Sequence, residues 1–415
     1  EYMQDGFIKV AAATPKIKVA DVAYNARSIA ACINAAANNG AKAIVLPELC
    51  LTAYTCGDLF LQERLIQNAL DGICWIAQAV KESDILAAVG MPLLVGNRLY
   101  NTAAVLKGGK ILGFVTKTHL PNYSEFYEQR HFNSMEGNTT VRINGEEIPV
   151  GNRLLFYSEN LPAFTVGCEI CEDLWAADSP GTLHALAGAS VIFNLSASDE
   201  TVGKKEFRHL LIKTQSAKTV CAYLYADAGN GESTTDMVFA GHNMIYENGT
   251  LLAESALFEH EILYTEIDVR RLSLERRKIS TFREREDDRY QKIPFTLTLE
   301  PTALTRFVDP LPFVPKSEVE RARRCEEIFA LQYMGLVQRL RHIGTKTVTV
   351  GISGGLDSTL ALLVTVKAFD QLELNRDGII AVTMPCFGTT KRTRTNAEKM
   401  INALGVQFRE VPIAD

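Results

Sequence analysis

Residues 164–175, FTVGCEICEDLW, join a mostly apolar run to a cysteine and two acidic side chains. The run up to Ile170 predicts a buried strand, because short apolar runs without helical periodicity are typical of strands inside a sheet. Cys171 stands where that strand turns. Its CxxC spacing with Cys168 suggests a metal or redox pair, but no second cysteine pair is close and a tetrahedral zinc site usually has four ligands. We therefore interpret Cys168 as packing and Cys171 as the candidate functional cysteine.

Similar apolar runs alternate with amphipathic stretches from residue 7 to about residue 270. Residues 21–38 have apolar side chains at helical spacing, and Gly40 ends that expected helix. KGGK and NGT sequences between apolar runs predict hairpins. Buried strands are expected at 43–46, 86–89, 103–106, 111–115, 164–170, 191–195 and 222–225. Residues 1–275 are thus expected to form one α/β domain with a mixed sheet or a pair of sheets.

Two more of these strand ends carry side chains that a nucleophilic cysteine needs. Glu48 follows the strand at 43–46, and Lys117 follows the run at 111–115. A cysteine nucleophile requires a base and groups that stabilise an oxyanion, and a glutamate and a lysine can supply both. Taken singly, Glu48 could be a helix-start carboxylate and Lys117 a solvated lysine. The functional interpretation depends on finding all three residues at strand ends.

The character of the chain changes after residue 275. Residues 276–289 are densely charged with both signs, and five of the 14 prolines lie between Pro294 and Pro315. Proline at that density opposes regular structure, so residues 276–325 are interpreted as a linker or interdomain arm. An expected helix at 317–342, strand at 347–352, helix at 359–369 and strand at 379–383 follow. That order predicts a parallel, doubly wound sheet in a second domain, residues 326–415.

The string SGGLDST, residues 353–359, joins the first strand of this second domain to a helix. Backbone N–H groups at a helix N-terminus, with glycines that allow close approach, make an anion site. Asp357 suits a polyanion only if a cation lies between them, and Mg²⁺ bridging carboxylate and phosphates meets that condition. The string has neither Walker A nor GxGxxG spacing. The alternative is a turn with glycine for geometry and polar residues as helix caps. The stretch from Met384 to Asn396 is interpreted either as a nucleotide-contacting loop or as a mobile solvated loop.

Composition and charge argue against several other classes of protein. The 415 residues are 47% hydrophobic with a net charge of -6, which is ordinary for a soluble globular protein and argues against a dedicated nucleic-acid binder. The N-terminus has no basic region before its short apolar run, so it is not expected to be a signal peptide. The most apolar stretch, 85–106, is interrupted by glycine, proline and arginine, which opposes a membrane span. Nine scattered cysteines fit a reducing cytoplasm better than a disulfide framework.

Four strings together resemble the nitrilase superfamily: LPEL around Glu48, TKTHLP around Lys117, CEDLW at Cys171 and NLSAS at 194–198. That superfamily cleaves carbon–nitrogen bonds of amides and nitriles with a Glu-Lys-Cys triad. The resemblance covers nearly all of residues 7–270 and implies a four-layer α-β-β-α sandwich. It implies that Glu48 takes the thiol proton, and that Lys117 favours the thiolate and, with a backbone N–H near Cys171, holds the oxyanion. Glu128 matches the extra glutamate that relatives keep beside the lysine.

The SGGLDS string resembles the pyrophosphate-binding loop of the ATP pyrophosphatases, which adenylate a substrate and release pyrophosphate. A nitrilase-type amidase followed by this loop is similar to the family of glutamine-dependent NAD synthetases. The resemblance implies that ATP adenylates the carboxylate of nicotinic acid adenine dinucleotide. Ammonia from glutamine then gives NAD, AMP and pyrophosphate. The implied ATP-binding residues are Gly351, Ile352, Ser353, Gly354, Gly355, Leu356, Asp357 and Ser358, with Asp357 also helping to hold Mg²⁺.

The same resemblance implies a glutamine pocket. Tyr123, Ser198 and Lys204 match the positions that hold glutamine, although Lys205 leaves the lysine assignment open by one position. The implied pocket walls are Tyr54, Glu172 and Trp175. Glu172 could bind the α-ammonium group of the substrate, and the alternative is an exposed acid without a ligand.

The family resemblance also sets expectations about partners. It implies small-molecule substrates, ATP with Mg²⁺, no tightly bound organic cofactor, and no nucleic-acid or membrane partner. It further implies a cytoplasmic homo-oligomer, an octamer or hexamer, with a protected route for ammonia. Because related synthetase domains run well beyond Asp415, the second domain is expected to be incomplete here. Two alternatives remain: an amidase with a degenerate nucleotide-binding domain, which would not depend on ATP, and a non-catalytic protein whose Cys171 resists glutamine-like alkylators.

Overall fold

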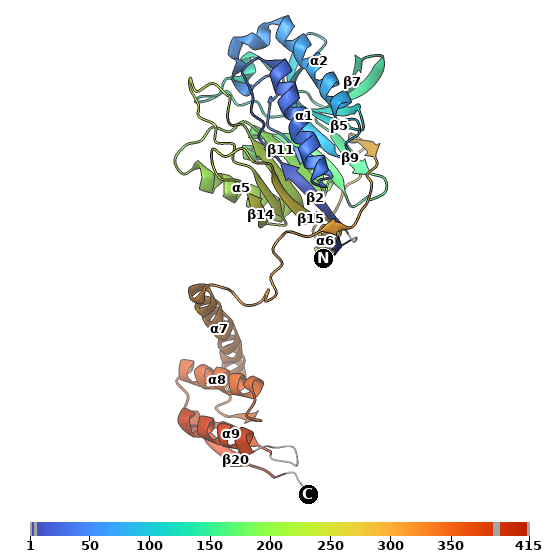
Figure 1. Cartoon of the computed structure of the whole chain (residues 1–415). Helices are drawn as coiled ribbons and strands as arrows, with labels where there is room; N and C mark the ends of the chain where they lie inside the picture. Colours follow the sequence, from blue (N-terminus) through green and yellow to red (C-terminus); the bar gives the residue numbers. More distant parts are fainter. Residues whose placement is uncertain (1, 4–5, 385–390, 413–415) are drawn as a thin grey trace. The chain divides into compact units, whose positions relative to one another are not determined.

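The computed structural model of the chain describes residues 2–3, 6–384 and 391–412. The chain divides into two compact units, residues 1–307 and 308–415 (Figure 1). The first unit therefore extends well beyond residue 275, where the sequence placed its end.

The segment expected to be an interdomain arm, 276–325, contributes strands to the first unit. Within it, β16 (Gln291–Phe295) pairs in parallel with β9 (Leu154–Ser158), and β17 (Thr302–Ala303) pairs with β1 (Tyr2–Met3). Proline opposes a strand only where its missing N–H would be needed, and β16 is an edge strand, where Pro294 is tolerated. The proline-based prediction of an arm is therefore wrong for this part.

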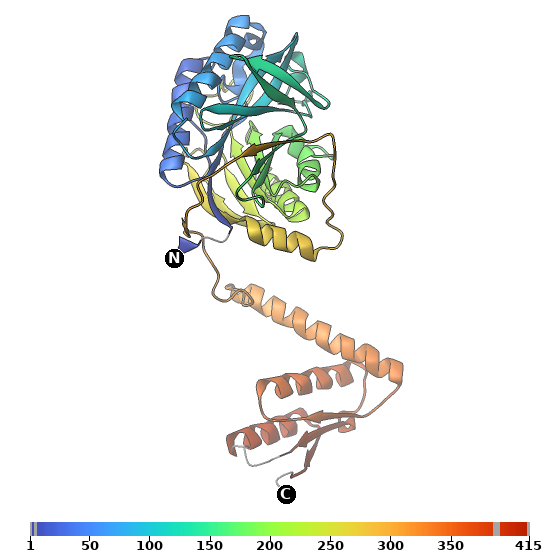
Figure 2. The same ribbon diagram turned by 90° about the vertical axis from the view of Figure 1, so that its right-hand side faces the viewer.

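Two large mixed sheets form the body of the first unit (Figure 2). The eight-stranded sheet has the order β15 (Leu263–Asp268), β2 (Phe7–Ala12), β3 (Ala43–Val45), β4 (Leu86–Val95), β5 (Arg98–Lys107), β6 (Lys110–Thr116), β8 (Glu146–Gly151), β7 (Asn138–Ile143). The seven-stranded sheet has the order β14 (Thr250–Glu254), β13 (Met244–Glu247), β12 (Ala222–Asp227), β11 (Val191–Ser196), β10 (Thr165–Ile170), β9, β16. The central strands β2–β3–β4 and β10–β11–β12 run parallel, and most of the outer pairs are antiparallel. This confirms the expected pair of mixed sheets.

The helices of the first unit lie outside the sheets. They are α1 (Val22–Asn38), η1 (Tyr54–Leu61), α2 (Glu63–Ala79), η2 (Glu128–Arg130), α3 (Glu172–Trp175), α4 (Pro180–Leu186), α5 (Lys204–Thr219) and α6 (Val269–Lys278). The α1 helix begins after Asp21, whose side chain caps it by accepting from Tyr24 N.

Three apolar clusters separate four layers. One cluster joins α1 and α2 to the eight-stranded sheet, a second fills the space between the two sheets, and a third packs α5 against the seven-stranded sheet. Alternate residues of β11 show this, since Val191 and Phe193 face the other sheet and Ile192 faces the helix layer. The α-β-β-α sandwich expected from the sequence is confirmed.

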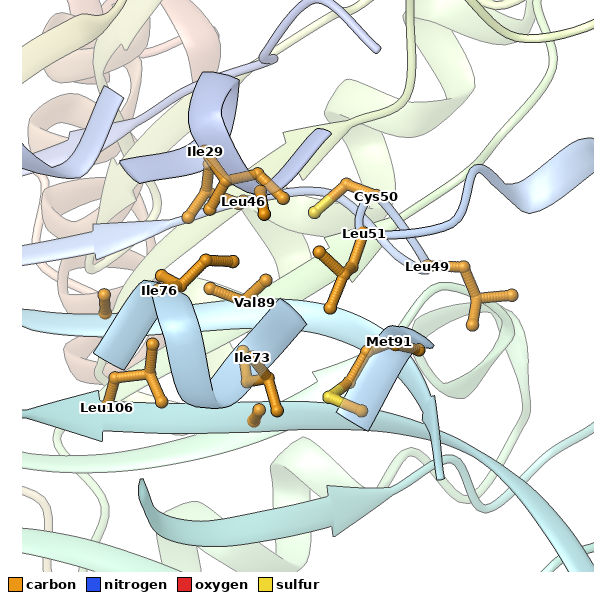
Figure 3. Close-up of a cluster of buried hydrophobic side chains, with 14 of the residues drawn as sticks. Ile29, Leu46, Leu49, Cys50, Leu51, Ile73, Ile76, Val89, Met91 and Leu106 are labelled. Atoms are coloured by element: carbon orange, nitrogen blue, oxygen red, sulfur yellow. The ribbon is translucent and has the colours of Figure 1, made fainter. Parts of the chain in front are cut away.

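The first cluster surrounds the turn that follows β3 (Figure 3). Leu49 and Leu51, both wholly buried, lie in this turn, and Ile73 and Ile76 of α2 together with Met91 of β4 pack in the same cluster. Glu48 lies in the same turn. Packing on the helix side of the sheet therefore fixes the backbone that carries Glu48.

The predicted hairpins are present. Gly108 and Gly109 connect β5 to β6 with φ of 57° and 80°, and Asn248 and Gly249 connect β13 to β14 with φ of 45° and 76°. Two successive residues with positive φ make the type I′ turn that matches the twist of paired strands.

The second unit contains a parallel sheet of order β18 (Val348–Gly351), β19 (Ile379–Thr383), β20 (Gln407–Glu410). Its helices are α7 (Glu318–Ile343), α8 (Leu356–Gln371), η3 (Arg376–Gly378) and α9 (Lys391–Leu404). A separate apolar cluster, which includes Val337, Leu362, Phe369 and Ile379, holds it together. The predicted parallel sheet is confirmed. Of the stretch from Met384 to Asn396, residues 385–390 lie outside the described residues and the rest from Lys391 begins α9.

Two further observations concern membranes and cysteines. Within the described residues, every helix is too short or too polar to cross a membrane. The eight cysteines in the described part of the chain are all free thiols.

Candidate active site

Glu48, Lys117 and Cys171 lie at the ends of three buried strands, as expected. Glu48 follows β3, Lys117 follows β6 and Cys171 follows β10, so the residues come from both sheets. All three are buried, with at most 6% of any one exposed. The end of β11 joins two of the turns, because Cys171 N donates to Leu195 O (3.0 Å) and Glu48 N donates to Ser196 O (3.3 Å).

Lys117 lies between two carboxylates. Its Nζ is 2.6 Å from Glu48 Oε1 and 2.7 Å from Glu128 Oε1, and all three side chains are almost wholly buried. Burial lowers the pKa of Lys117, but the two carboxylates outweigh burial and raise it well above its ordinary value. The lysine is therefore a permanent cation, since its alternative would leave two buried anions uncompensated.

Glu48 is held from four sides. Asn101 Nδ2 donates to Oε1 (2.6 Å), Ala197 N donates to Oε2 (3.0 Å), and Lys117 and the backbone contact of Glu48 N complete the set. Burial raises its pKa to about 7, although Lys117 opposes this shift. A carboxylate with a pKa near neutrality is suited to accept and return a proton.

Cys171 forms a strained turn between β10 and α3. Its φ of 46° lies in the left-handed region, which residues other than glycine rarely adopt. Burial and the charge of Glu48 raise the pKa of its thiol well above the ordinary value, and the opposing effect of Lys117 is smaller. Lys117 does favour the thiolate, as expected, but burial and Glu48 outweigh its effect on the pKa of the thiol. A second carboxylate, Glu128, also raises the pKa of this thiol. The resting form of Cys171 is therefore the thiol.

The residues expected to line the glutamine pocket fall into two groups near Cys171. Tyr123 OH donates to both Glu172 oxygens at 2.9 Å. Lys204 Nζ pairs with Asp199 and lies 5.5 Å from the Trp175 ring centroid. Each group therefore places one charged side chain beside an aromatic ring.

Lys204 and Lys205, between which the sequence left the lysine assignment open, have different contacts. Lys205 Nζ pairs with Glu254 (2.8 Å), at the end of β14, whereas Lys204 contacts Trp175 and Phe126. Of the two lysines, Lys204 is the one that lies beside Trp175, at the end of the short helix α3 that follows Cys171. The geometry favours Lys204.

Tyr54 and Ser198 are placed by different contacts. Tyr54 OH donates to Glu128 Oε1 (2.9 Å), and both residues line a cleft of about 150 Å³ with Phe132 and Met237. Ser198 is buried, and its N donates to Asp227 Oδ1 (2.8 Å). Glu128 Oε2 is buried without a hydrogen-bond partner.

The fold and this site have counterparts among known proteins. The carbon–nitrogen hydrolase family matches residues 9–277, which is more than half of the chain. The chain belongs to the carbon–nitrogen hydrolase family. The NAD synthase family matches residues 329–415, which contain the SGGLDS loop.

Curated relatives align with this chain across both of these regions. The glutamine-dependent NAD(+) synthetase of Mycobacterium bovis is 40% identical over 99% of this chain and 62% of its own length. Those of Mycobacterium leprae and Aquifex aeolicus are 39% and 29% identical, over 62% and 60% of their lengths. The chain thus spans somewhat under two thirds of the curated relatives that it matches.

Solved structures agree on the fold. A glutamine-dependent NAD(+) synthetase from Cytophaga hutchinsonii is 21% identical with a TM-score of 0.57, over 98% of this chain and 65% of that one. Saccharomyces cerevisiae Nit3, of the nitrilase superfamily, is 21% identical with a TM-score of 0.52, over 68% of this chain and 97% of that one. The second similarity supports the α-β-β-α assignment of this carbon–nitrogen hydrolase unit.

Three polar residues of the carbon–nitrogen hydrolase site were missed by sequence reasoning. Asn101 donates to Glu48, Asp173 accepts from the backbone beside Lys117, and Asp227 accepts from Ser198 N and Ala228 N. Asp173 stands two residues after Cys171, and that proximity was an available signal. Asn101 and Asp227 carry no local signal, because their contacts join residues 53 and 29 positions apart.

The SGGLDS loop of the second unit follows β18 and opens α8. Gly354 has φ of 81°, and Ser353 Oγ accepts from Gly355 N (3.3 Å), which folds the loop tightly over the helix start. Ser358 Oγ donates to Gly355 O (3.1 Å). Asp357, in the first turn of α8, is exposed. The loop is therefore open to solvent at the carboxyl end of a parallel strand, where ligands of such sheets bind.

One group of metal-ligand side chains occurs in the described part of the chain: His209, His242 and Glu254. Arg208 Nη1 lies 2.6 Å from His242 Nδ1, so that nitrogen accepts and the proton resides on Nε2, which faces Glu254 (2.9 Å). Lys205 also pairs with Glu254. Two cations and a protonated Nε2 make this group an ion-pair network rather than a metal site.

Proposed function

We propose that the first unit hydrolyses the side-chain amide of glutamine through a thioester at Cys171. The observation that carries the proposal is the buried network in which Lys117 joins Glu48 and Glu128 beside a thiol on a strained turn. Membership of the carbon–nitrogen hydrolase family supports the class of bond that is cleaved.

The first half of the reaction forms the thioester. Cys171 Sγ attacks the amide carbon while its proton moves to Glu48, because the resting sulfur is protonated. Glu48 then passes this proton to the leaving nitrogen, which departs as ammonia. Lys117 uses two of its three N–H donors on Glu48 and Glu128, so the third is available to the oxyanion together with a backbone N–H near Cys171.

The second half releases glutamate. Water attacks the thioester carbon and gives its proton to Glu48, whose pKa of about 7 lets it take and return a proton at neutral pH. The tetrahedral intermediate collapses, Cys171 Sγ leaves, and Glu48 returns the proton to the sulfur.

The charged ends of glutamine find complementary partners in this proposal. Glu172 binds the α-ammonium group, and Lys204 binds the α-carboxylate. Tyr123 already orients Glu172, and Asp199 already orients Lys204. Tyr54 and Trp175 form the walls, and Ser198 lies on the loop that follows β11.

We further infer that the second unit adenylates nicotinic acid adenine dinucleotide with ATP, and that ammonia from glutamine displaces AMP to give NAD. The match to the NAD synthase family and the 40% identity to a relative named glutamine-dependent NAD(+) synthetase support this step. A related synthetase from Acinetobacter baumannii was solved with ADP. The phosphates would lie against residues 351–358 at the start of α8.

Mg²⁺ fits the donor set of this loop. Asp357 offers an exposed carboxylate, and the Ser353 and Ser358 hydroxyls lie 3.1 Å apart in the same loop, so the donors are the oxygens that Mg²⁺ prefers. When bound, the ion would neutralise phosphate charge. Asp357 would hold it, and the loop N–H groups would orient the phosphates.

The proposal extends to the assembly. Ammonia is mostly protonated at neutral pH, and ammonium is not a nucleophile, so a protected route between the two reactions is expected. By family resemblance we propose a cytoplasmic homo-oligomer, an octamer or hexamer, that contains this route.

The test is NAD formation by the complete polypeptide that contains this chain, from nicotinic acid adenine dinucleotide and ATP. Glutamine and ammonium are compared as nitrogen donors in the wild type and in Cys171→Ala. We expect the variant to lose glutamine-driven synthesis and keep ammonium-driven synthesis. If the wild type makes no NAD from either donor while still hydrolysing an amide, the protein is an amidase with a different second unit.

A further inference from the structure

Asp173 occupies an unusual position beside the nucleophile. It lies in α3, two residues after Cys171, and only 1% of it is exposed. Its carboxylate accepts three backbone N–H groups: Oδ2 accepts from Ile170 (2.9 Å), and Oδ1 accepts from Thr118 (3.1 Å) and His119 (2.8 Å). These contacts go to chain segments on either side of the active site.

The three donors lie close to the lysine and the cysteine of the site in the sequence. Ile170 directly precedes Cys171, and Thr118 directly follows Lys117. The first belongs to β10 in the seven-stranded sheet, and the second follows β6 in the eight-stranded sheet. One carboxylate therefore joins the ends of strands from two different sheets.

The contact to Ile170 also spans the strained residue. A left-handed φ costs a residue other than glycine about 1–2 kcal/mol, and such a conformation persists only where its surroundings hold it. The hydrogen bond from Ile170 N to the Asp173 side chain closes a loop around Cys171. Burial raises the pKa of Asp173 to about 8, and the N–H donors of Ile170 and His119 oppose that rise.

We propose that Asp173 is a positioning residue that fixes the Lys117 turn relative to the Cys171 thiol. It contacts no reacting atom. Its carboxylate holds the Lys117 turn, on one sheet, to the cysteine turn, on the other, and so sets where the lysine N–H meets the developing oxyanion. The inference rests on the proposed role of Cys171 as nucleophile.

Asp173→Asn tests the proposal with almost no change in shape. The amide has one acceptor oxygen, and its NH₂ group would face an N–H donor, so the three backbone contacts cannot all persist. The matched control is Glu266→Gln, because Glu266 is also wholly buried and accepts two backbone N–H groups, from Thr305 and Arg306, away from this site.

The measurements are kcat and KM for glutamine hydrolysis, the rate of Cys171 alkylation by iodoacetamide, and the melting temperature, all on the complete polypeptide. A displacement of about 1 Å costs about 100-fold in rate, so we expect Asp173→Asn to lower kcat about 10- to 100-fold with KM within about threefold. Cys171 alkylation should change in rate in the same variant. Glu266→Gln should lower the melting temperature and leave kcat within about twofold.

The proposal is overturned if the two variants lower the melting temperature by the same amount and also lower kcat by the same factor. If Asp173→Asn does not fold, Asp173→Glu keeps the carboxyl group and lengthens the side chain, and a kcat equal to the wild type would then overturn it. If the wild type does not hydrolyse glutamine, the proposed function fails. The alkylation rates, which need no substrate, still decide the role of Asp173.

Discussion

Lys117 shows how one buried cation sets the protonation of its neighbours. Two carboxylates keep it charged, and burial still raises the pKa of one of them, Glu48, to about 7. The same balance keeps the Cys171 thiol protonated. Proton transfer therefore has to accompany attack, and Glu48 is the group with the matching pKa.

This balance predicts the pH dependence of glutamine hydrolysis. Glu48 can accept the thiol proton only when it is ionised, so kcat/KM should rise with pH and level off above about 7. The check is a pH–rate profile between pH 5 and pH 10. Because Glu128 raises the pKa of Glu48, Glu128→Gln should move the inflection to lower pH in the activity that remains. An inflection only at alkaline pH, where the thiol itself ionises, would show that a preformed thiolate reacts instead.

At the scale of elements, the Glu48 turn depends on a glycine in the neighbouring strand. A Cβ on Gly90 of β4 would lie 2.3 Å from Leu49 N and 2.3 Å from Pro47 O, and both are backbone atoms that cannot move aside. Leu49 itself has φ of 51°. Close backbone approach between β4 and this turn is thus a condition for placing Glu48.

Gly90→Ala should therefore affect both stability and activity. Overpacking of this kind costs about 1–3 kcal/mol, and the displaced Glu48 turn should lower kcat at least about 10-fold. Denaturant unfolding and glutamine hydrolysis are the measurements. Gly335→Ala is the control, because its Cβ would meet no atom within 4 Å and alanine favours a helix. Equal stability and activity of the two variants would contradict this account of the turn.

Helix α4 carries a buried histidine that should make stability depend on pH. The neutral His184 ring donates from Nε2 to Cys168 O (2.9 Å) and accepts at Nδ1 from Tyr290 OH (2.8 Å), and burial lowers its pKa to about 4. The unfolded chain protonates this ring near pH 6.5, so neutral His184 contributes stability that is complete above 6.5 and is lost as pH falls toward 4.

We expect the free energy of unfolding to fall by up to about 1.4 kcal/mol per pH unit in this range for each such histidine. The measurement is urea unfolding at pH 4.5 to 7 for the wild type and His184→Gln. The variant should be less stable at pH 7 but should show a shallower slope. A slope equal to that of the wild type would mean that another group titrates, such as His242, whose pKa burial also lowers to about 4.

Elements of regular pattern could be predicted from the sequence, and elements defined by distant partners could not. The helix at 21–38 and the strand at 43–46 are confirmed, because periodicity and apolar runs report burial directly. Strand β7 was missed, since most of Asn138–Ile143 is polar and exposed at a sheet edge. Strand β16 was missed because Pro294 indicated a linker.

The same distinction, between residues marked by local pattern and residues defined by distant partners, applies to the candidate site of the first unit. Glu48, Lys117 and Cys171 could be located from their positions after apolar runs, since parallel strands end together. Asn101 and Asp173 could not be assigned contacts, because the contact of Asn101 follows from the strand order within one sheet and those of Asp173 follow from how the two sheets stack. The direction of the thiol pKa was also beyond the sequence, since it depends on Glu128 and on burial.

The two units have separate cores, and this predicts how the molecule responds to protease. Residues 304–317 contain no helix or strand, and within them Phe313 is 91% exposed. All residues proposed for amide hydrolysis lie before residue 205, and their packing clusters end by residue 297.

Brief chymotrypsin treatment should therefore cut near Phe313 and leave an N-terminal fragment that still hydrolyses glutamine. The measurements are the fragment masses and the hydrolysis rate per Cys171, which should stay within about twofold of the uncut chain because no group that acts on the amide is removed. Phe313→Ser should slow cleavage at this point without changing the rate. A fragment that is folded but inactive would mean that residues beyond 313 complete the hydrolase site, and the assignment of that reaction to the first unit alone would then be wrong.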